Sequence, residues 1–195
     1  MDATGTIDLL NSKVYTIMTN SCTGGLPLAI IITTSESEDA ITEALRIIKD
    51  DLSENLFNPK IFMTDNNSAE RNALAAVFPN AVLLLCQFHV LQAIWRYIWK
   101  SESGIQSLDR GHLFFLFKAL VLEKNREIFD AKMNAFLEDD IVKKYQDFMT
   151  YLEDYYWKIK ESWASCFRTE LITRGQTTNN ICEASMRVNI KFFKN

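Results

Sequence analysis

The spacing of hydrophobic residues along the first part of the chain switches between that of strands and that of helices. Residues 14–19 and 26–34 are apolar runs rich in β-branched side chains, and the segment NSCTGG between them carries the paired glycines that suit a hairpin turn. Apolar side chains at helical spacing then predict a helix over residues 38–52, with Ser37 or a neighbouring glutamate as its cap. The pattern therefore predicts an antiparallel pair of strands followed by a helix.

Strand and helix patterns alternate again between residues 60 and 100. Residues 60–64 and 81–86 are short apolar runs, whereas residues 68–77 and 89–100 have helical spacing. A strand, helix, strand, helix order needs a crossover between its two strands, which makes them parallel neighbours. This part of the chain predicts the α/β fold class.

From about residue 106 the pattern becomes purely helical. Stripes of apolar and aromatic side chains with a period of about 3.6 residues run from residue 108 to residue 165 and predict an all-helical lobe with an aromatic core. After the turn-rich segment LITRGQTTNN, the segment NICEASMRVNIKFF predicts one last helix. The chain is thus expected to have three parts, namely residues 1–105, a helical insertion over residues 106–170, and residues 171–195.

Composition limits the class of protein. With 195 residues, of which 48% are hydrophobic and 24% charged, the chain can bury one sizeable core. The formal net charge of −4 gives no overall basic field, so a nucleic-acid contact requires a local basic patch or another domain. The cysteines are scattered, no secretory leader is apparent and the apolar runs are too short to cross a bilayer. We therefore expect a soluble intracellular protein with no membrane partner.

Three carboxylates stand out by their positions. Asp2 precedes the first hairpin, Asp65 ends a predicted parallel strand, and Glu183 sits in the last predicted helix. Ligands of open α/β sheets collect beyond the carboxyl ends of the strands, which is where Asp65 is placed. Carboxylates crowded there repel one another unless a cation joins them, and oxygen ligands suit Mg²⁺ or Mn²⁺. Two such ions can hold both the attacking and the leaving oxygen of a phosphodiester.

Each carboxylate also has a structural interpretation. Asp65 stands before Asn-Asn-Ser, so it equally suits a cap of the following helix. Asn180-x-x-Glu183 fits a capping box, and Glu183 with Arg187 fits an i,i+4 surface pair. Asp8 is the fallback for Asp2 because it is the other carboxylate in that segment.

Three segments carry a resemblance to a known family. MDATG, MTDNNSAERNALAAVFPNAVLLLCQFHVLQAIWR and TTNNICEASMRV together resemble the MULE (Mutator-like element) transposases and the related SWIM-type zinc-finger proteins, and the resemblance covers nearly the whole chain. It implies a ribonuclease H-like fold, with three antiparallel strands, two further parallel strands, and a helical insertion before the last core helix. Because only Met1 precedes Asp2, the first strand is expected to be largely missing, whether the chain is a fragment or a truncated product.

The resemblance also implies a function. Asp2, Asp65 and Glu183 would form a DDE triad that binds two Mg²⁺ or Mn²⁺ ions for DNA strand nicking and strand transfer. Transposon ends and target DNA would be the partners, the protein would be nuclear, and it could act as a homo-oligomer. The alternative is a domesticated, catalytically silent module that binds DNA or protein within a SWIM-type polypeptide. A purely structural helical protein would account for the insertion but not for the order of the carboxylates.

Cys86 and His89 match the C(2)H signature of the family. A structural zinc site needs about four ligands, and Cys166, Cys182 and His112 are the candidates to complete it. The other interpretation is a buried cysteine at a strand end with a hydrogen-bonded histidine beside it. No G-x-S-x-G motif or glycine-rich phosphate loop points to other chemistry.

Basic and amide side chains near the C-terminal end are candidate DNA contacts. The candidates are Arg168, Arg174, Arg187, Lys191 and Lys194, with Thr177, Asn179 and Asn180 beside them. Such side chains bind phosphates. A solvated basic face is the other interpretation of the same residues.

Overall fold

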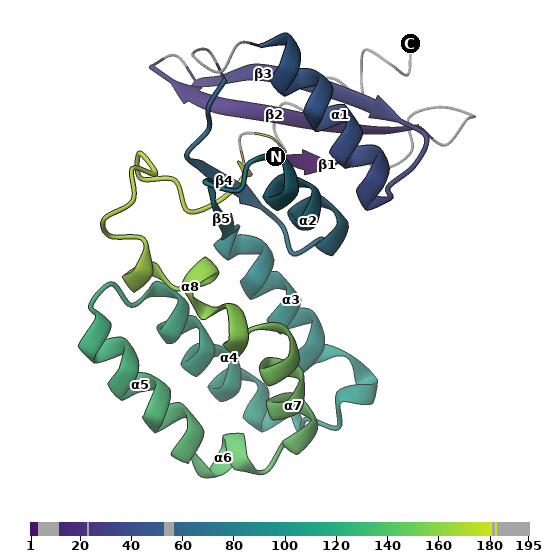
Figure 1. The fold of residues 1–195 in the computed structure, drawn as a ribbon. Helices are drawn as coiled ribbons and strands as arrows, with labels where there is room; N and C mark the ends of the chain where they lie inside the picture. Colours follow the sequence, from purple (N-terminus) through teal and green to yellow (C-terminus); the bar gives the residue numbers. More distant parts are fainter. Residues whose placement is uncertain (4–11, 23, 53–56, 181, 183–195) are drawn as a thin grey trace. The chain divides into compact units, whose positions relative to one another are not determined.

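The computed structural model describes residues 1–3, 12–22, 24–52, 57–180 and 182 (Figure 1). Contacts divide the chain into an α/β unit, residues 1–86 with 174–195, and a helical unit, residues 87–173. The predicted α/β class is confirmed. The contacts divide the chain after Cys86, whereas the sequence placed the boundary near residue 105.

Two small sheets form the α/β unit. Strands β1 (Asp2–Ala3), β2 (Lys13–Ser21) and β3 (Gly24–Thr33) pair antiparallel in the order β1-β2-β3, which confirms the predicted hairpin. Strands β4 (Ile61–Thr64) and β5 (Val82–Leu85) pair parallel, as the crossover pattern predicted. The described residues thus form a three-stranded and a two-stranded sheet, not the single five-stranded sheet that the resemblance implies.

A backbone hydrogen bond connects the two sheets. The terminal ammonium of Met1 donates to the Met63 carbonyl of β4 at 2.8 Å, while the adjoining Asp2 pairs with Thr16 of β2. The backbone of Met1 and Asp2 therefore lies between β2 and β4. The structure describes two residues of the first strand, and residues 4–11 lie outside its described part.

Two helices lie side by side next to these strands and supply the core (Figure 1). Helix α1 (Glu38–Asp51) begins where the Ser37 hydroxyl accepts the Ala40 N–H, as predicted, and α2 (Ser68–Val77) begins at Asn67. Their buried residues join one face of the hairpin in a single cluster, which includes Tyr15, Ile17, Ile31, Ile41, Leu45, Phe62, Ala73, Leu74 and Phe78.

The helical unit confirms the predicted all-helical pattern. Its helices are α3 (Gln87–Trp99), α4 (Ser107–Leu122), α5 (Arg126–Glu138), α6 (Asp140–Lys143), α7 (Gln146–Tyr155) and α8 (Lys160–Trp163), with short 3-10 helices η1 (Ser101–Ser103), η2 (Trp157–Ile159) and η3 (Ser165–Phe167). Aromatic side chains fill its centre. Trp163 is fully buried, and its ring lies 5.3 Å from that of Phe117 and 6.1 Å from that of Phe129.

A buried amide ties three parts of the helical unit together. The Gln87 side-chain amide donates to the Val121 carbonyl at 3.1 Å, the Trp163 carbonyl at 2.9 Å and the Ser165 hydroxyl at 2.8 Å. Gln87 is 4% exposed, so water cannot replace this donor. The start of α3 is thereby fixed to the ends of α4 and α8.

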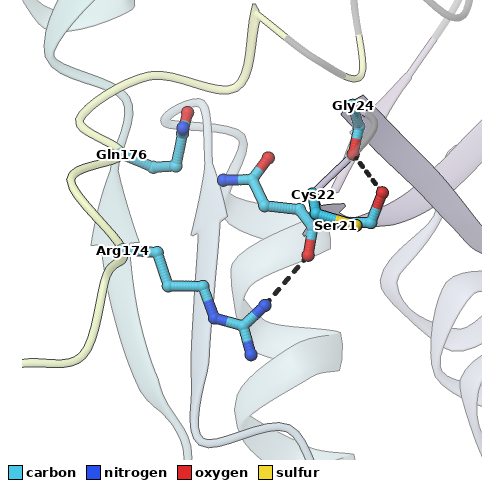
Figure 2. A pocket seen from close by; sticks show the side chains of 6 residues that line it. Ser21, Cys22, Gly24, Arg174 and Gln176 are labelled. Atoms are coloured by element: carbon cyan, nitrogen blue, oxygen red, sulfur yellow. Dashed lines mark hydrogen bonds between the residues drawn. The ribbon is translucent and has the colours of Figure 1, made fainter.

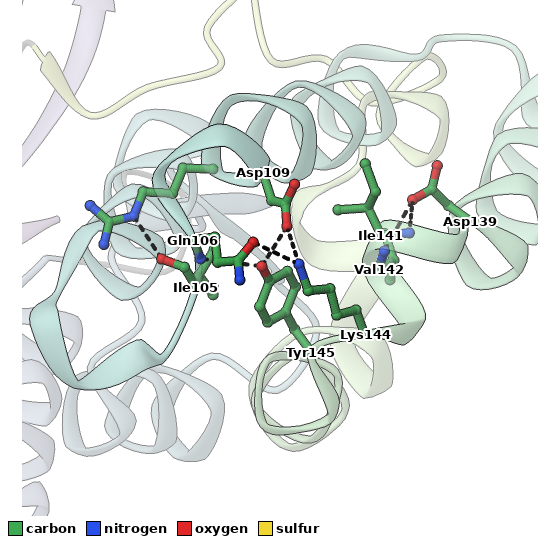
Figure 3. Close-up of polar contacts among 9 residues, drawn as sticks. Ile105, Gln106, Asp109, Asp139, Ile141, Val142, Lys144 and Tyr145 are labelled. Atoms are coloured by element: carbon green, nitrogen blue, oxygen red, sulfur yellow. Dashed lines mark hydrogen bonds and ion pairs between the residues drawn. The ribbon is translucent and has the colours of Figure 1, made fainter.

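The first turn of α4 is held by a second polar network (Figure 3). The Asp109 carboxylate accepts hydrogen bonds from Lys144 at 2.8 Å and from the Tyr145 hydroxyl at 2.5 Å. Hydrogen bonds from Lys144, then from Tyr145, hold the pKa of Asp109 below its usual value. The Gln106 N–H donates to the Tyr145 hydroxyl at 3.2 Å, so the orientation of α4 is set from its N-terminus.

Replacing Gln87 by methionine should destabilise the protein. The change keeps the side-chain volume but removes the donor that the Val121 and Trp163 carbonyls share, at a cost of about 1–3 kcal/mol. Urea unfolding followed by fluorescence would measure the loss. The matched control is Gln92→Met on the same helix, where the side chain is half-buried. An equal effect of both substitutions would contradict the role of the Gln87 amide.

Candidate functional site

Asp65 lies immediately beyond the carboxyl end of β4. Its side chain is half-buried, and Oδ1 accepts the N–H of Asn67 at 3.2 Å. Asn67 is the cap of α2, because its own side chain accepts the Glu70 N–H at 3.1 Å. The structural interpretation of Asp65 as the helix cap is therefore wrong. Asp65 instead forms the turn between β4 and α2, with one carboxylate oxygen engaged by the backbone.

Asp2 lies in the same unit at the level of the backbone. Its register partner is Thr16 of β2, and the residue before it is hydrogen-bonded to Met63, two positions before Asp65. Two of the three predicted carboxylate positions are therefore on neighbouring segments. Thr16 itself is fully buried, and its hydroxyl has no hydrogen-bond partner among the described residues.

Negative charge gathers around the buried hydroxyl of Tyr15 on β2. Burial above all, and then the charges of Glu36, Glu70 and Asp65, raise the pKa of Tyr15 to about 12. Glu70, in the first turn of α2, is only 1% exposed. Burial lowers the pKa of the adjacent Arg71, and the charges of Glu70 and Asp65 oppose that change. Asp65 and Glu70 thus both affect the pKa of Tyr15 and that of Arg71, so the surroundings of this end of β4 are acidic.

Glu70 is a residue that the sequence interpretation missed. It stands three positions after the cap Asn67, in the Asn-x-x-Glu spacing of a capping box, and that spacing is the signal that could have found it. Its burial is a tertiary feature. Because α2 covers the core with Ala73 and Leu74, the preceding turn brings Glu70 inward.

The third predicted carboxylate, Glu183, lies outside the described residues, as does Asp8, the fallback for Asp2. The described part ends at Cys182, which is buried and whose N–H donates to the Asn179 carbonyl at 2.8 Å. In the described ranges no group of three or more His, Cys, Asp or Glu side chains is placed to hold a metal ion. Convergence of Asp2, Asp65 and Glu183 stays a prediction.

The cysteine and histidine of the C(2)H signature follow β5. Cys86 is fully buried, and its N–H donates to the Thr64 carbonyl at 2.7 Å, which extends the parallel ladder by one bond. His89 is in the first turn of α3. Of the residues considered for completing a zinc site, His112 contacts the Asp139 carboxylate at 2.9 Å, and burial raises the pKa of the Cys166 thiol. A zinc site at Cys86 and His89 stays a prediction.

Arg174 is the candidate DNA contact that the structure describes best (Figure 2). It adopts a positive φ of 52° and donates from Nη1 to the Asn20 carbonyl at 2.9 Å, which joins the connector to the end of the hairpin. A cavity of about 520 Å³, open to solvent, lies between the two segments. It is lined by Asn20, Ser21, Cys22, Gly24, Arg174 and Gln176. One nitrogen of the guanidinium is held by the backbone, so the group is oriented at the mouth of this cavity.

The other candidate DNA contacts have different environments. Asn180 is exposed, whereas Asn179 is 4% exposed and its side-chain amide has no hydrogen-bond partner among the described residues. Arg168 is buried and donates to the Ser162 carbonyl at 2.6 Å, so it serves the interior of the helical unit. Arg187 and Lys191, with Lys194, lie outside the described residues.

The raised pKa of Tyr15 predicts a loss of stability at alkaline pH. In the unfolded chain the phenol ionises near pH 10, and in the folded chain only near 12, so its contribution is complete below pH 10 and is lost as the pH rises to 12. Tyr15→Phe should remove about 2 kcal/mol of this alkaline loss. Urea unfolding at pH 9 and pH 11.5 measures it, with the exposed Tyr155→Phe as control. An alkaline loss as large in Tyr15→Phe as in the parent would contradict it.

Comparison with known proteins finds a similarity in the first part of the chain. No curated protein matches it. Among the described residues no helix combines the length and the apolar character needed to cross a bilayer. The model of the MULE transposase domain matches residues 3–93, a range that includes Asp65, Cys86 and His89 and stops short of Asp2 and Glu183. Residues 3–93 of this chain are therefore similar to the MULE transposase domain.

Proposed function

We propose that the α/β unit is the catalytic core of a DDE-type DNA transposase, which nicks and transfers DNA strands with the help of divalent metal ions. The position of Asp65 carries this proposal, because it follows β4 within the segment that matches the transposase domain. The backbone of Asp2 beside the same strand supports it. Transposon ends and target DNA are then the partners, and the nucleus is the expected location.

The proposal includes a ribonuclease H-like sheet in the order β3-β2-β1-β4-β5. The pairs β2–β3, β1–β2 and β4–β5 supply three of its four neighbour contacts, and the Met1 to Met63 hydrogen bond supports the fourth, between β1 and β4. In this order β1 is the central strand. Its Asp2 would then stand next to the strand that ends at Asp65.

The side chains at this end of β4 fit a hard divalent cation. Asp65 offers a second oxygen that has no partner among the described residues, and oxygen ligands suit Mg²⁺ and Mn²⁺. The charges of Glu36, Glu70 and Asp65, which add to burial in raising the pKa of Tyr15, would be offset by a bound cation. Asp2, Asp65 and Glu183 would hold two such ions, which when bound lower the pKa of water and neutralise charge on a phosphodiester.

The protein's own groups would orient the reaction. The Asn67 N–H fixes one oxygen of Asp65, so the carboxylate keeps its direction without help from a ligand. Arg174, held by the Asn20 carbonyl, would contact a backbone phosphate of DNA from the connector that leads to Glu183. The fold itself would thus contribute to catalysis by positioning the phosphate and the carboxylates.

Replacing Asp65 by asparagine should abolish nicking. The change preserves the turn with Asn67 but removes a charged oxygen ligand, so Mn²⁺-dependent nicking of a supercoiled plasmid should fall about 100-fold or more. Calorimetry of Mn²⁺ binding provides a second readout, in which affinity should also fall. The control is Asp51→Asn, an exposed acid at the end of α1.

Two outcomes would count against the enzyme. Equal nicking by the parent and Asp65→Asn would reject the catalytic role of Asp65. If the parent binds DNA but does not nick it with Mn²⁺ or Mg²⁺, the domesticated, catalytically silent DNA-binding module is the correct function.

Replacing Arg174 by glutamine should weaken DNA binding uniformly across sequences. Loss of one phosphate contact lowers the affinity severalfold and reduces the slope of log affinity against log salt by about 1. Fluorescence anisotropy with labelled duplexes at several salt concentrations measures both. Arg46→Gln on α1 is the control, because Arg46 is exposed and pairs with Glu43 at 3.9 Å. An unchanged salt slope in Arg174→Gln would contradict the contact.

A further inference from the structure

Helix α4 of the helical unit is apolar on both sides. Its inner face packs into the unit through Leu113, Phe117, Leu120 and Val121, all of which are buried. On its outer face, Leu108 is 93% exposed, Phe115 66% and Leu122 49%. A helix that is hydrophobic all round is normally buried all round. The exposed outer face is therefore a candidate surface for contact with another protein chain.

The outer face has a spacing that reads the same in both directions. Leu108, Gly111, Phe115, Ala119 and Leu122 follow one another at intervals of three, four, four and three residues, and we name these five residues the outer stripe. Large and small side chains alternate along it, with Phe115 at the centre. Because helical neighbours are three and four residues apart, the outer stripe forms one continuous line along α4.

Such a stripe is complementary to itself when two copies run antiparallel. A two-fold axis through Phe115 places Leu108 opposite the partner's Leu122 and Gly111 opposite the partner's Ala119. The two small residues leave room for the partner's Phe115, whose ring would lie between them. An isologous interface requires this kind of self-complementary surface.

Gly111 provides an independent reason for close approach by another helix. It lies within α4, where glycine is less favourable than alanine. A Cβ added to Gly111 would meet no atom of the described residues within 4 Å, so packing within this part of the chain does not require glycine there. Close contact with a second helix backbone would require it.

Aromatic side chains of α3 extend the outer face. Trp95 is 44% exposed, stacks on Trp99 at 3.6 Å, and meets Phe114 of α4 edge-on at 5.3 Å. Phe114 in turn lies 6.2 Å from Phe115, so a series of ring contacts links α3 to the outer stripe. Phe88 of α3 is 46% exposed and adds to the exposed apolar surface of that helix.

The exposed apolar area suits a dimer of this chain. Aromatic side chains have areas of roughly 150–250 Å² when free, and we take the lower end of that range for leucine. The exposed fractions of Phe88, Trp95 and the three large residues of the outer stripe leave on the order of 500 Å² per copy. A standard interface buries about 800 Å² per partner, and about 65% of a homodimer interface is apolar, which also gives about 500 Å².

We propose that this chain forms a two-fold symmetric homodimer through antiparallel pairing of the outer stripe of α4 with that of a second copy. The self-complementary spacing selects a second copy over an unrelated protein. The polar network at Asp109 holds the first turn of α4 in place, so the outer stripe is presented on a rigid helix (Figure 3).

Sedimentation and light scattering of the full chain test the proposal. At micromolar concentration the parent should have twice the chain mass of 22.5 kDa, and Phe115→Glu should have the mass of one chain. Ile47→Glu, at an exposed isoleucine of α1, is the control and should stay dimeric. Circular dichroism verifies that each variant is folded. A monomeric parent, or a dimer that Phe115→Glu leaves intact, would overturn the proposal.

Two further variants separate the interface from the fold. Gly111→Ala should raise the melting temperature of the dilute monomer, because alanine favours the helix, and should weaken dimerisation at least severalfold. In a chain with the exposed Cys22 replaced by serine, Phe115→Cys should form a disulfide-linked dimer. Leu108→Cys should not, because two-fold related copies of that residue would be about 20 Å apart. Crosslinking of Leu108→Cys alone would reject the antiparallel arrangement.

Discussion

The backbone of Met1 and Asp2 lies between β2 and β4, and the proposed active site depends on that placement. Asp2 pairs with Thr16 on one side, while the Met1 ammonium bonds to the Met63 carbonyl on the other. Buried strands must have their peptide groups paired, and the described residues of β1 pair with β2 and supply a donor to β4. It also sets the position of one proposed carboxylate relative to the strand that ends at Asp65.

The environment of Asp65 follows from the packing of α2. Asn67, not Asp65, caps that helix, and Asp65 forms the turn before it. Glu70, in the first turn of the helix, is buried. Burial above all, and then the charges of these carboxylates and of Glu36, raise the pKa of Tyr15. The same crowding of negative charge would favour the binding of a divalent cation. An energetic cost at a strand end is typical of a functional site.

Hydrophobic spacing predicted most of the fold because it reports local geometry. The hairpin of β2 and β3, the parallel pair β4 and β5, and helices α1 and α2 agree with their predicted ranges to within a few residues. Spacing did not predict that α3 groups with the helical unit, because the Gln87 amide that fixes it there bonds to carbonyls 34 and 76 residues away. Nor did it predict the buried Glu70, whose burial depends on how α2 lies on the core. The position of Asp65 was predictable, whereas its neighbours were not.

The two proposals rest on separate parts of the molecule, which makes them independent. Asp65 and the backbone of Asp2 belong to the α/β unit, whereas the outer stripe belongs to α4 of the helical unit. Pairing through α4 would bring two α/β units into one assembly without using any of the described residues assigned to DNA or metal ions. In such a protein the helical unit would supply the symmetry and the α/β unit the chemistry.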